Sequence, residues 1–493
     1  MRLSIIRRIV GYVLLLEAAL LLLPCIVALI YGESQGIAYI TVSGICFAFG
    51  CILAIKKPAK NVFYLKEGCV ATALSWIFLS IFGALPFCIT GEIESFTNAL
   101  FETVSGFTTT GASILTDVEA LSHCSLFWRS LTHWIGGMGV LVFILAVVPL
   151  SSGSNINLLR AESPGPSVSK IVPKMRTTAE ILYGIYMVMT VLEIVFLLIG
   201  GMPLFDALTT SFGTAGTGGF GIKNDSMGSY SPYIQWVVTI FMVLFGVNFN
   251  AYCLILFRQF KKSLKMEEVR CYFIIIAVSI AIILANTVKI YDNVFEAFTQ
   301  AAFQVSSIIT TTGFSTADFN LWSGTSKTVL VLLMFVGACA GSTGGGLKVS
   351  RIMVSLKTIF KEFKSYIHPK RVFKIKIEGK TVEHDIIKAT NAYFLTFIAL
   401  FVVSVFFISF DNFDLVTSFT SVAATINNIG PGLELVGPTG NFSAFSIFSK
   451  YVLIFDMLAG RLELFPLLLL FYPSLWKEAA SQGNTKIKKS ITK

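Results

Sequence analysis

Long apolar stretches constrain this chain more than any other feature of its sequence. Several reach roughly 18–22 residues, the length at which a helix crosses the hydrocarbon core of a bilayer. With 55% hydrophobic and only 13% charged residues among 493, the chain is too apolar for a soluble protein of its size. The sequence predicts an all-α polytopic membrane protein. Its ten candidate spans lie near residues 9–30, 37–55, 69–90, 127–150, 179–201, 233–257, 272–289, 328–346, 391–410 and 447–473.

Basic residues gather in alternate connections between these spans. By the positive-inside rule, loops rich in Lys and Arg stay on the cytoplasmic side, so both termini are expected in the cytoplasm. This topology accounts for the net charge of +10 without a nucleic-acid-binding surface. The segments that hold 32 of the 38 basic residues are 1–8, 56–66, 151–178, 258–270, 348–388 and 477–493.

Four further stretches between the spans are too short or too polar to cross the membrane. Each begins with a helix-like pattern and ends at a glycine. The first and third are the most alike, since GFTTTGASIL (106–115) and IITTTGFSTAD (308–318) share a Thr-Thr-Thr-Gly run. The repeating unit is span, short re-entrant helix, glycine turn and span. The stretches are 95–113, 204–221, 294–315 and 413–432, and they end at Gly111, Gly218, Gly313 and Gly430.

Four such units predict a pseudo-fourfold arrangement around a central axis, preceded by two helices outside the repeat. We expect two extra N-terminal transmembrane helices at 1–60, pore repeats at 61–160, 161–262, 263–375 and 376–476, and a basic cytoplasmic tail at 477–493.

The glycine turns have a chemical use at membrane depth. Non-helical backbone is tolerated there only when it is buried in protein or lines water, and a ring of carbonyls can replace the hydration shell of a cation. The C-terminal end of each short helix would also turn its negative dipole toward the ion. Acidic residues near the outer helix ends either concentrate cations or simply cap the helices; they are Glu94, Asp206, Asp292, Asp411 and Asp414.

Seven motifs together resemble the Trk/Ktr/HKT superfamily of potassium transport proteins, and in particular its TrkH-type membrane subunit. The resemblance covers residues 60–476, and the two extra N-terminal helices also fit the TrkH type. The motifs are SGFTTTGASIL (105–115), THWIGGMGV (132–140), GTGGFG (216–221), ITTTGFSTADF (309–319), GACAGSTGGGLKVSR (337–351), NNIGPGL (427–433) and MLAGRLELFP (457–466).

The resemblance implies that the chain takes up K⁺, bound by backbone carbonyls of a selectivity filter. The second turn, with Ala215-Gly216, and the fourth, with Asn427-Asn428-Ile429, depart from the Thr-rich pattern. A filter with unlike quarters should discriminate less strictly, so some passage of rubidium or sodium is expected. The implied K⁺ ligands are Thr109, Thr110 and Gly111; Gly216, Thr217 and Gly218; Thr311, Thr312 and Gly313; and Asn428, Ile429 and Gly430.

A Gly-rich run interrupts the eighth span and predicts a break. Each interior glycine costs a helix about 1 kcal/mol relative to alanine, and 337–346 holds five; close helix packing through small residues is the alternative. In similar proteins this segment is a gating loop and the arginine matching Arg461 lies nearby, whereas a buried pair with Asp456, Glu463 or Glu17 would also explain that arginine. The expected gate residues are Gly337, Gly341, Ser342, Thr343, Gly344, Gly345, Gly346 and Arg461.

Two motifs point misleadingly to nucleotides. GTGGFG satisfies G-x-G-x-x-G but follows no strand, and GSTGGGLK resembles a P-loop with Lys348 one place late. No catalytic set of side chains is evident, so an enzyme is not expected. Nine cysteines without a C-x-x-C pair and four histidines without ligand spacing favour buried thiols over a resident metal site.

The resemblance also implies partners and a location. We expect a homodimer in the cytoplasmic (inner) membrane, seated on a cytosolic nucleotide-binding regulatory subunit of the TrkA kind, with K⁺ as the transported ion and no organic cofactor on this chain. The basic segment 347–388 suits either lipid headgroups or such a partner. The alternative function is a secondary transporter for another small solute with broken helices.

Overall fold

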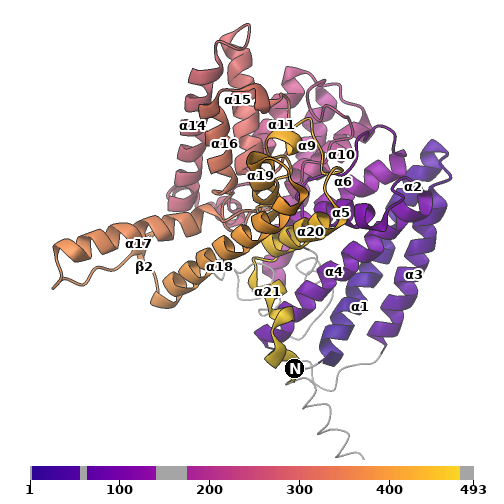
Figure 1. Cartoon of the computed structure of the whole chain (residues 1–493), viewed down its shortest axis with the longest axis horizontal. Coiled ribbons are helices and arrows are strands. Elements are labelled where there is room, and N and C mark those ends of the chain that lie inside the picture. The colour runs from indigo at the N-terminus through magenta and orange to yellow at the C-terminus, as the bar shows by residue number, and fades with distance from the viewer. Residues whose placement is uncertain (1–2, 56–63, 140–174, 478–493) are drawn as a thin grey trace, which may run out of the picture.

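The computed structural model describes residues 3–55, 64–139 and 175–477, most of them in helices (Figure 1). Parts of several predicted segments lie outside these residues. They are parts of the expected segments 1–60, 61–160 and 161–262, the C-terminal part of the candidate span 127–150, and most of the basic tail at 477–493. The chain begins with α1 (Leu3–Leu20), α2 (Leu22–Tyr31) and α3 (Gly36–Ala54).

Small residues bring the two extra N-terminal helices together. A methyl group built on Gly11 of α1 would lie 2.9 Å from the backbone nitrogen of Ala54, and one on Gly50 would lie 3.0 Å from the carbonyl oxygen of Gly11. Such close backbone approach is the usual way in which membrane helices pack. Both α1 and α3 also pack against α4 of the first repeat, and α1, α2, α3 and α4 form the indigo and purple side of the molecule (Figure 1).

Short helices occupy all four of the predicted re-entrant stretches. They are α5 (Phe96–Phe107), α10 (Leu204–Gly216), α15 (Val294–Ile309) and α19 (Leu415–Ile426). The helices before them are α4 (Leu65–Thr90), α9 (Met175–Ile199), α14 (Glu267–Thr287) and α18 (His384–Ile408). The helices after them are α6 (His123–Met138), α11 (Pro232–Phe245) with α12 (Phe249–Leu256), α16 (Gly324–Met334), and α20 (Ile447–Arg461) with α21 (Phe465–Leu468).

The connections that the structure describes contain several short elements and one longer helix. The short elements are α13 (Phe260–Leu264), η1 (Phe319–Leu321), η2 (Ser409–Asp411), η3 (Glu434–Val436), η4 (Leu469–Phe471) and the antiparallel hairpin of β1 (Lys376–Ile377) and β2 (Lys380–Thr381). One longer helix, α17 (Val349–Ile367), projects sideways from the bundle next to this hairpin (Figure 1).

The prediction of continuous spans is wrong at three places in the described part of the chain. The helix expected over 127–150 ends at Met138, the last residue of α6, before Gly139 (φ 81°). The candidate 233–257 is two helices, α11 and α12, bent by 88°, because the side chain of Asn248 accepts a hydrogen bond from the Asn250 N–H (2.9 Å) and starts a new helix. The candidate 447–473 ends at Arg461, where Glu463 and Leu464 take positive φ angles. The predicted break in 328–346 is confirmed, since α16 stops at Met334.

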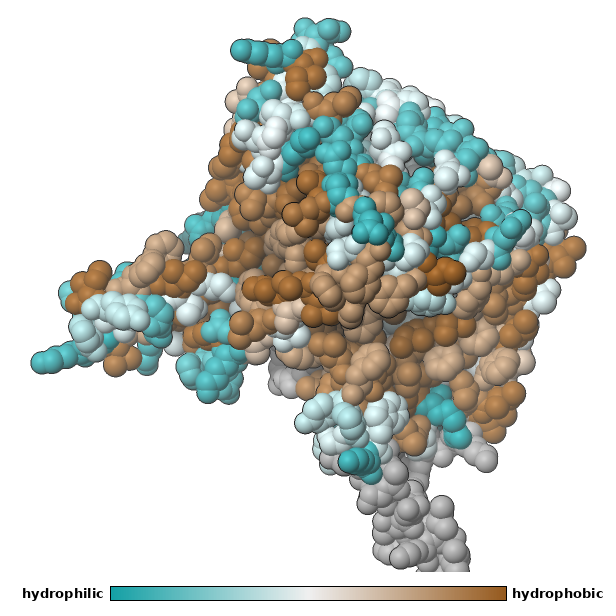
Figure 2. All heavy atoms as spheres, in the orientation of Figure 1, coloured by the Kyte–Doolittle hydropathy of each residue, from teal (hydrophilic) through white to brown (hydrophobic). Residues whose placement is uncertain are grey.

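Among the described residues, six helices are long and apolar enough to cross a membrane, or seven if α11 and α12 count as one bent span. Apolar side chains lie exposed along them; Leu29 is 82% and Ile30 74% exposed. The apolar surface runs across the middle of the molecule, and hydrophilic residues gather toward its two ends (Figure 2). This distribution suits a bundle whose sides contact lipid.

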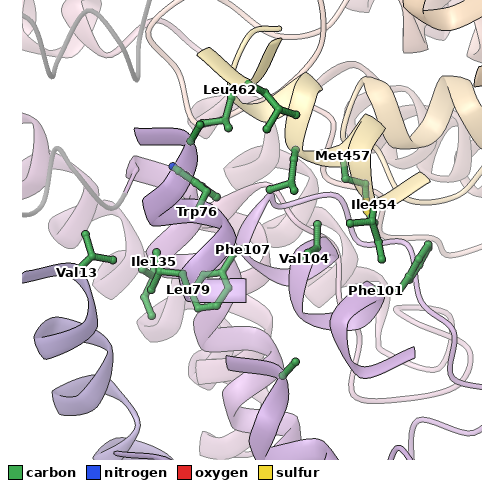
Figure 3. Packing of buried hydrophobic residues seen from close by; sticks show 14 of the residues in the cluster. Val13, Trp76, Leu79, Phe101, Val104, Phe107, Ile135, Ile454, Met457 and Leu462 are labelled. Carbon is green, nitrogen blue, oxygen red and sulfur yellow. The ribbon is translucent and has the colours of Figure 1, made fainter. Parts of the chain in front are cut away.

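The first re-entrant helix is embedded in the largest apolar core. Trp76 and Leu79 of α4, Phe107 of α5 and Met457 of α20 belong to this cluster (Figure 3). The ring of Phe107 packs edge-on against Trp128, with centroids 6.0 Å apart. Such packing holds the short helix at a fixed depth, which fixes the turn that follows it.

Candidate ion-binding site

Each of the four short helices ends in the same strained turn. In the first turn, Thr109 takes a left-handed conformation (φ 55°), its N–H bonds the carbonyl of Gly106 (3.0 Å), and the Thr110 N–H bonds that of Ser105 (2.8 Å). This pair of bonds is the Schellman motif, whose left-handed residue is usually glycine. The equivalent left-handed residues are Thr217 (φ 54°), Thr311 (φ 59°) and Asn428 (φ 55°), each with the same two bonds.

The use of Thr and Asn in these positions is costly. A left-handed conformation costs an L-residue about 1–2 kcal/mol, and such strain persists only where the surroundings enforce it, often at functional sites. All four of these side chains are fully buried. The same strained conformation at the same position therefore makes the four turns structurally equivalent.

The alignment predicted for the second turn is one residue out. Since Thr217 is the left-handed residue, Gly219 (φ 76°) and not Gly218 corresponds to Gly111 (φ 79°), and Gly216 ends helix α10. The sequence could not show this, because GTGGFG offers a glycine at every candidate position. The corrected triplets are Thr109-Thr110-Gly111, Thr217-Gly218-Gly219, Thr311-Thr312-Gly313 and Asn428-Ile429-Gly430.

The corrected triplets contact one another in a closed ring. In each triplet the third residue, a glycine, has its α-carbon against the carbonyl oxygen of the second residue of a neighbouring triplet. A methyl group on any of these glycines would overlap that oxygen. The contacts are Gly111 with Gly218, Gly219 with Thr312, Gly313 with Ile429, and Gly430 with Thr110.

Side chains reinforce this ring behind the backbone. The amide nitrogen of Asn428 donates to the Thr110 hydroxyl (2.9 Å) and to the Met457 carbonyl (2.9 Å), which joins the fourth turn to the first. Within the third turn, the hydroxyls of Thr310 and Thr312 lie 2.7 Å apart. The sequence predicted a role for the backbone here but not these links.

One acidic residue near the outer ends is a helix cap. Asp414 precedes α19, and its carboxylate accepts a hydrogen bond from the Thr417 N–H (2.9 Å). Hydrogen bonds from Thr417 lower the pKa of Asp414 from its ordinary value. For this residue the structure favours capping of the short helix.

The Gly-rich segment predicted to break the eighth span lies directly against the third and fourth turns. The Gly345 N–H donates to the Thr311 hydroxyl (2.6 Å), and a methyl group on Gly345 would come within 2.7 Å of the Asn427 carbonyl oxygen. The Cys339 N–H bonds the Gly246 carbonyl (3.1 Å), at the bend between α11 and α12. Positive φ angles occur at Gly337, Gly341 and Gly346, while Ser342, Thr343 and Gly344 complete the loop.

Arg461 joins this loop to the first repeat. One guanidinium nitrogen donates to the Thr343 carbonyl (2.9 Å), and the other donates to the carbonyls of Gly136 and Gly137, the latter at 2.8 Å. Glu463, an alternative partner in the sequence, is ion-paired with Arg351. Arg461 therefore connects the loop to α6 by hydrogen bonds.

Two residues that anchor the loop were missed by sequence reasoning. The Lys348 ammonium group donates to the carbonyls of Gly344 and Gly345, the latter at 3.0 Å, and this lysine has a positive φ of 71°. A P-loop instead turns its N–H groups toward a phosphate. Glu268 accepts bonds from Ala340 N–H (2.7 Å) and Ser350 N–H (3.2 Å), so it joins the loop to the start of α17.

A buried ion pair supports the first and second turns from outside the ring. Arg129 of α6 donates twice to one oxygen of Glu102 (2.9 and 2.7 Å) and once to the Gly221 carbonyl (3.1 Å). The other Glu102 oxygen accepts the Ile114 N–H (3.0 Å). Both side chains are at most 3% exposed. The pair therefore ties the segments that follow the two turns.

Comparison with known proteins places this chain among cation transporters. A family model described as "TrkH: Cation transport protein" matches residues 37–479. The chain is 37% identical to the Trk system potassium uptake protein TrkH of Salmonella typhimurium, over 96% of this chain and 99% of that relative. It is 31% identical to TrkG of Escherichia coli, over 95% and 97%.

A solved structure is similar over nearly the whole chain. The crystal structure of the potassium transporter TrkH from Vibrio parahaemolyticus matches with a TM-score of 0.88 and 33% identity, over 97% of this chain and 100% of that one. The likeness extends from the extra N-terminal helices to the last repeat.

Replacing Glu102 by Gln should destabilise the protein strongly. Removing one partner of a buried ion pair leaves the other charge uncompensated, at a cost of about 3–5 kcal/mol. We expect a clearly lower midpoint of thermal unfolding in detergent for Glu102→Gln. The control is Glu94→Gln at an exposed position before the same helix, which should unfold like the wild type. Equal midpoints for all three proteins would show that the pair does not stabilise the fold.

Proposed function

Since the chain belongs to the TrkH family of cation transport proteins, we propose that it is the ion-translocating subunit of a Trk-type potassium uptake system. The observation that carries the proposal is the closed ring of four turns. Relatives of matching length bear the name Trk system potassium uptake protein, which supports potassium as the transported ion.

The ring supplies the kind of ligand that a dehydrated potassium ion needs. Carbonyl oxygens can replace the hydration shell, and four oxygens from equivalent turns of one chain can do so at one level. The four short helices end at these turns, so the negative ends of their dipoles face the ion. We assign K⁺ binding to the four corrected triplets, with Gly219 in place of Gly216.

The loop at 337–346 serves as a gate in this proposal. It lies against the third and fourth turns, and its Gly345 N–H donates a hydrogen bond to the Thr311 hydroxyl. Arg461 holds the Thr343 carbonyl, and the two cations Arg461 and Lys348 together bind three successive loop carbonyls. Opening would require these bonds to be released.

The proposed setting is the cytoplasmic (inner) membrane, with both termini in the cytoplasm, as the distribution of basic loops favours. We also propose a homodimer and a cytosolic nucleotide-binding regulatory subunit, on the basis of the family resemblance. The projecting helix α17 supports a contact with another protein, because Phe360 and Phe363 are 60% and 59% exposed on it.

Ion flux into liposomes tests the function directly. Purified protein should let rubidium enter vesicles that are loaded with potassium and placed in a low-potassium buffer. The same uptake is then measured with an imposed proton or sodium gradient. Rubidium uptake that the gradient leaves unchanged indicates simple flow, and uptake that the gradient drives indicates coupled transport. Empty liposomes are the control. Failure to move rubidium, together with uptake of an amino acid or sugar, would favour the alternative of an organic-solute transporter.

Gly313→Ser should weaken the discrimination of potassium from sodium. Its side chain would overlap the Ile429 carbonyl oxygen at a φ of 88°, and should displace that oxygen from the ion. We expect the permeability ratio to fall by about tenfold, equivalent to about 1.4 kcal/mol. Gly324→Ser is the matched control, because nothing lies within 4 Å of the added atom. An unaltered ratio in Gly313→Ser would contradict the assignment.

Shortening the loop within 337–346 should raise basal flux. The deletion removes the bonds from Gly345 to Thr311 and from Arg461 to Thr343, so the space beneath the ring opens. Rubidium uptake per inserted protein is the measurement. A deletion of similar length in the β1–β2 hairpin controls for a shorter chain. Unchanged or lower flux in a correctly inserted protein would argue against a gate.

A further inference from the structure

The segment GTGGFG (216–221), which imitates a nucleotide-binding motif, lies against α6 and is shaped by one histidine. A methyl group on Gly216 would overlap the His133 carbonyl oxygen, and one on Gly218 would overlap the His133 ring itself. Two of the glycines that made the second turn unlike the others are therefore required by contact with His133.

The imidazole of His133 is fully buried and bonded at both nitrogens. Nδ1 lies 2.8 Å from the Gly106 carbonyl oxygen, and the Phe220 N–H donates to Nε2 at 3.1 Å. A carbonyl can only accept and a backbone N–H can only donate. The ring is therefore neutral, with its proton on Nδ1.

These two backbone groups belong to different turns of the ring. The Gly106 carbonyl also accepts the Thr109 N–H (3.0 Å), the bond that closes the first turn. Phe220 directly follows Gly219, the ring glycine of the second turn, and its side chain packs on the imidazole with centroids 4.2 Å apart. His133 thus links the Gly106 carbonyl, which closes the first turn, to Phe220, the residue that follows the second turn.

The position of the His133 side chain determines the position of one carbonyl oxygen in the ring of turns. Gly218, whose α-carbon lies against the His133 ring, presents its carbonyl oxygen to Gly111 of the first turn. A shift of the imidazole would move this oxygen relative to the other three. Arg129, four residues earlier on α6, donates to the carbonyl of Gly221, three residues after Gly218 (3.1 Å).

We propose that His133 is a positioning residue for cation discrimination, which keeps the second turn in register with the first. This inference rests on the proposed function of the ring as a potassium filter. The imidazole does not touch the ion; it sets the place of the Gly218 carbonyl through one donated and one accepted hydrogen bond.

Two amide substitutions separate the two bonds. His133→Asn places an amide nitrogen where Nδ1 lies, so it keeps the bond to Gly106 and loses the one from Phe220. His133→Gln places an oxygen near the position of Nε2, so it keeps the bond from Phe220 and loses the one to Gly106. His123→Asn, at an exposed histidine of the same helix, is the matched control.

The readout is the ratio of potassium to sodium permeability in liposomes. The number of folded copies cancels in a ratio, so a merely structural role would leave it unchanged. We expect both His133 variants to lower the ratio by about threefold to tenfold, the effect of one lost hydrogen bond. The control should keep the wild-type ratio. Wild-type ratios in both His133 variants would overturn the proposal.

Loss of transport in the variants still gives an answer. The midpoint of thermal unfolding of the purified protein is then compared in rubidium and in sodium. A ligand stabilises the state that binds it, so a higher midpoint in rubidium reports preference for that ion. If neither variant folds, Gly218→Ala, which presses on the imidazole, is measured in the same way against Gly184→Ala, which meets no atom within 4 Å. An unchanged preference overturns the proposal.

The outcome for the wild type separates this inference from the proposed function. A wild-type protein that carries or binds potassium and sodium equally would refute the filter itself. A wild-type protein that discriminates, beside His133 variants that discriminate equally well, would refute only the role of His133.

Discussion

The contact between a carbonyl oxygen of one turn and the α-carbon of a glycine in the next is the constraint on which the rest of this structure depends. It occurs four times and closes on itself, so no turn can move without displacing its neighbour. Each contact needs a left-handed residue two places before the glycine, at a cost of about 1–2 kcal/mol. Full burial of these four residues shows how the surrounding helices enforce that conformation.

The helices that follow the short helices approach the ends of those helices closely. Helix ends at membrane depth must find partners for their carbonyls within the protein, and several glycines allow other segments to approach the ends of the short helices. A methyl group on Gly136 would overlap the Phe107 carbonyl oxygen, and one on Gly460 would overlap that of Ile426. The loop after α16 approaches in the same manner, since a methyl group on Gly344 would lie 2.9 Å from the Thr310 oxygen.

The ring is nevertheless held by different chemistry at different junctions. Between the first and second turns the described side chains include a buried ion pair and a neutral imidazole. Between the fourth and first an amide reaches a hydroxyl at Thr110, and beyond the second and third turns a backbone bond joins Met227 to Ser315 (2.9 Å). Turns with one backbone geometry therefore sit in unlike environments.

By itself the sequence predicted the membrane setting and the position of three of the four left-handed turns, because apolar length and the Thr-Thr-Gly and Asn-Ile-Gly patterns are local properties of the chain. It also located the break at 337–346, since a run of glycines weakens a helix wherever it occurs. Only the tertiary structure decided that Gly219 belongs to the ring and that Gly218 faces His133. Adjacent glycines are indistinguishable along the chain, and what separates them is the neighbour that each one meets.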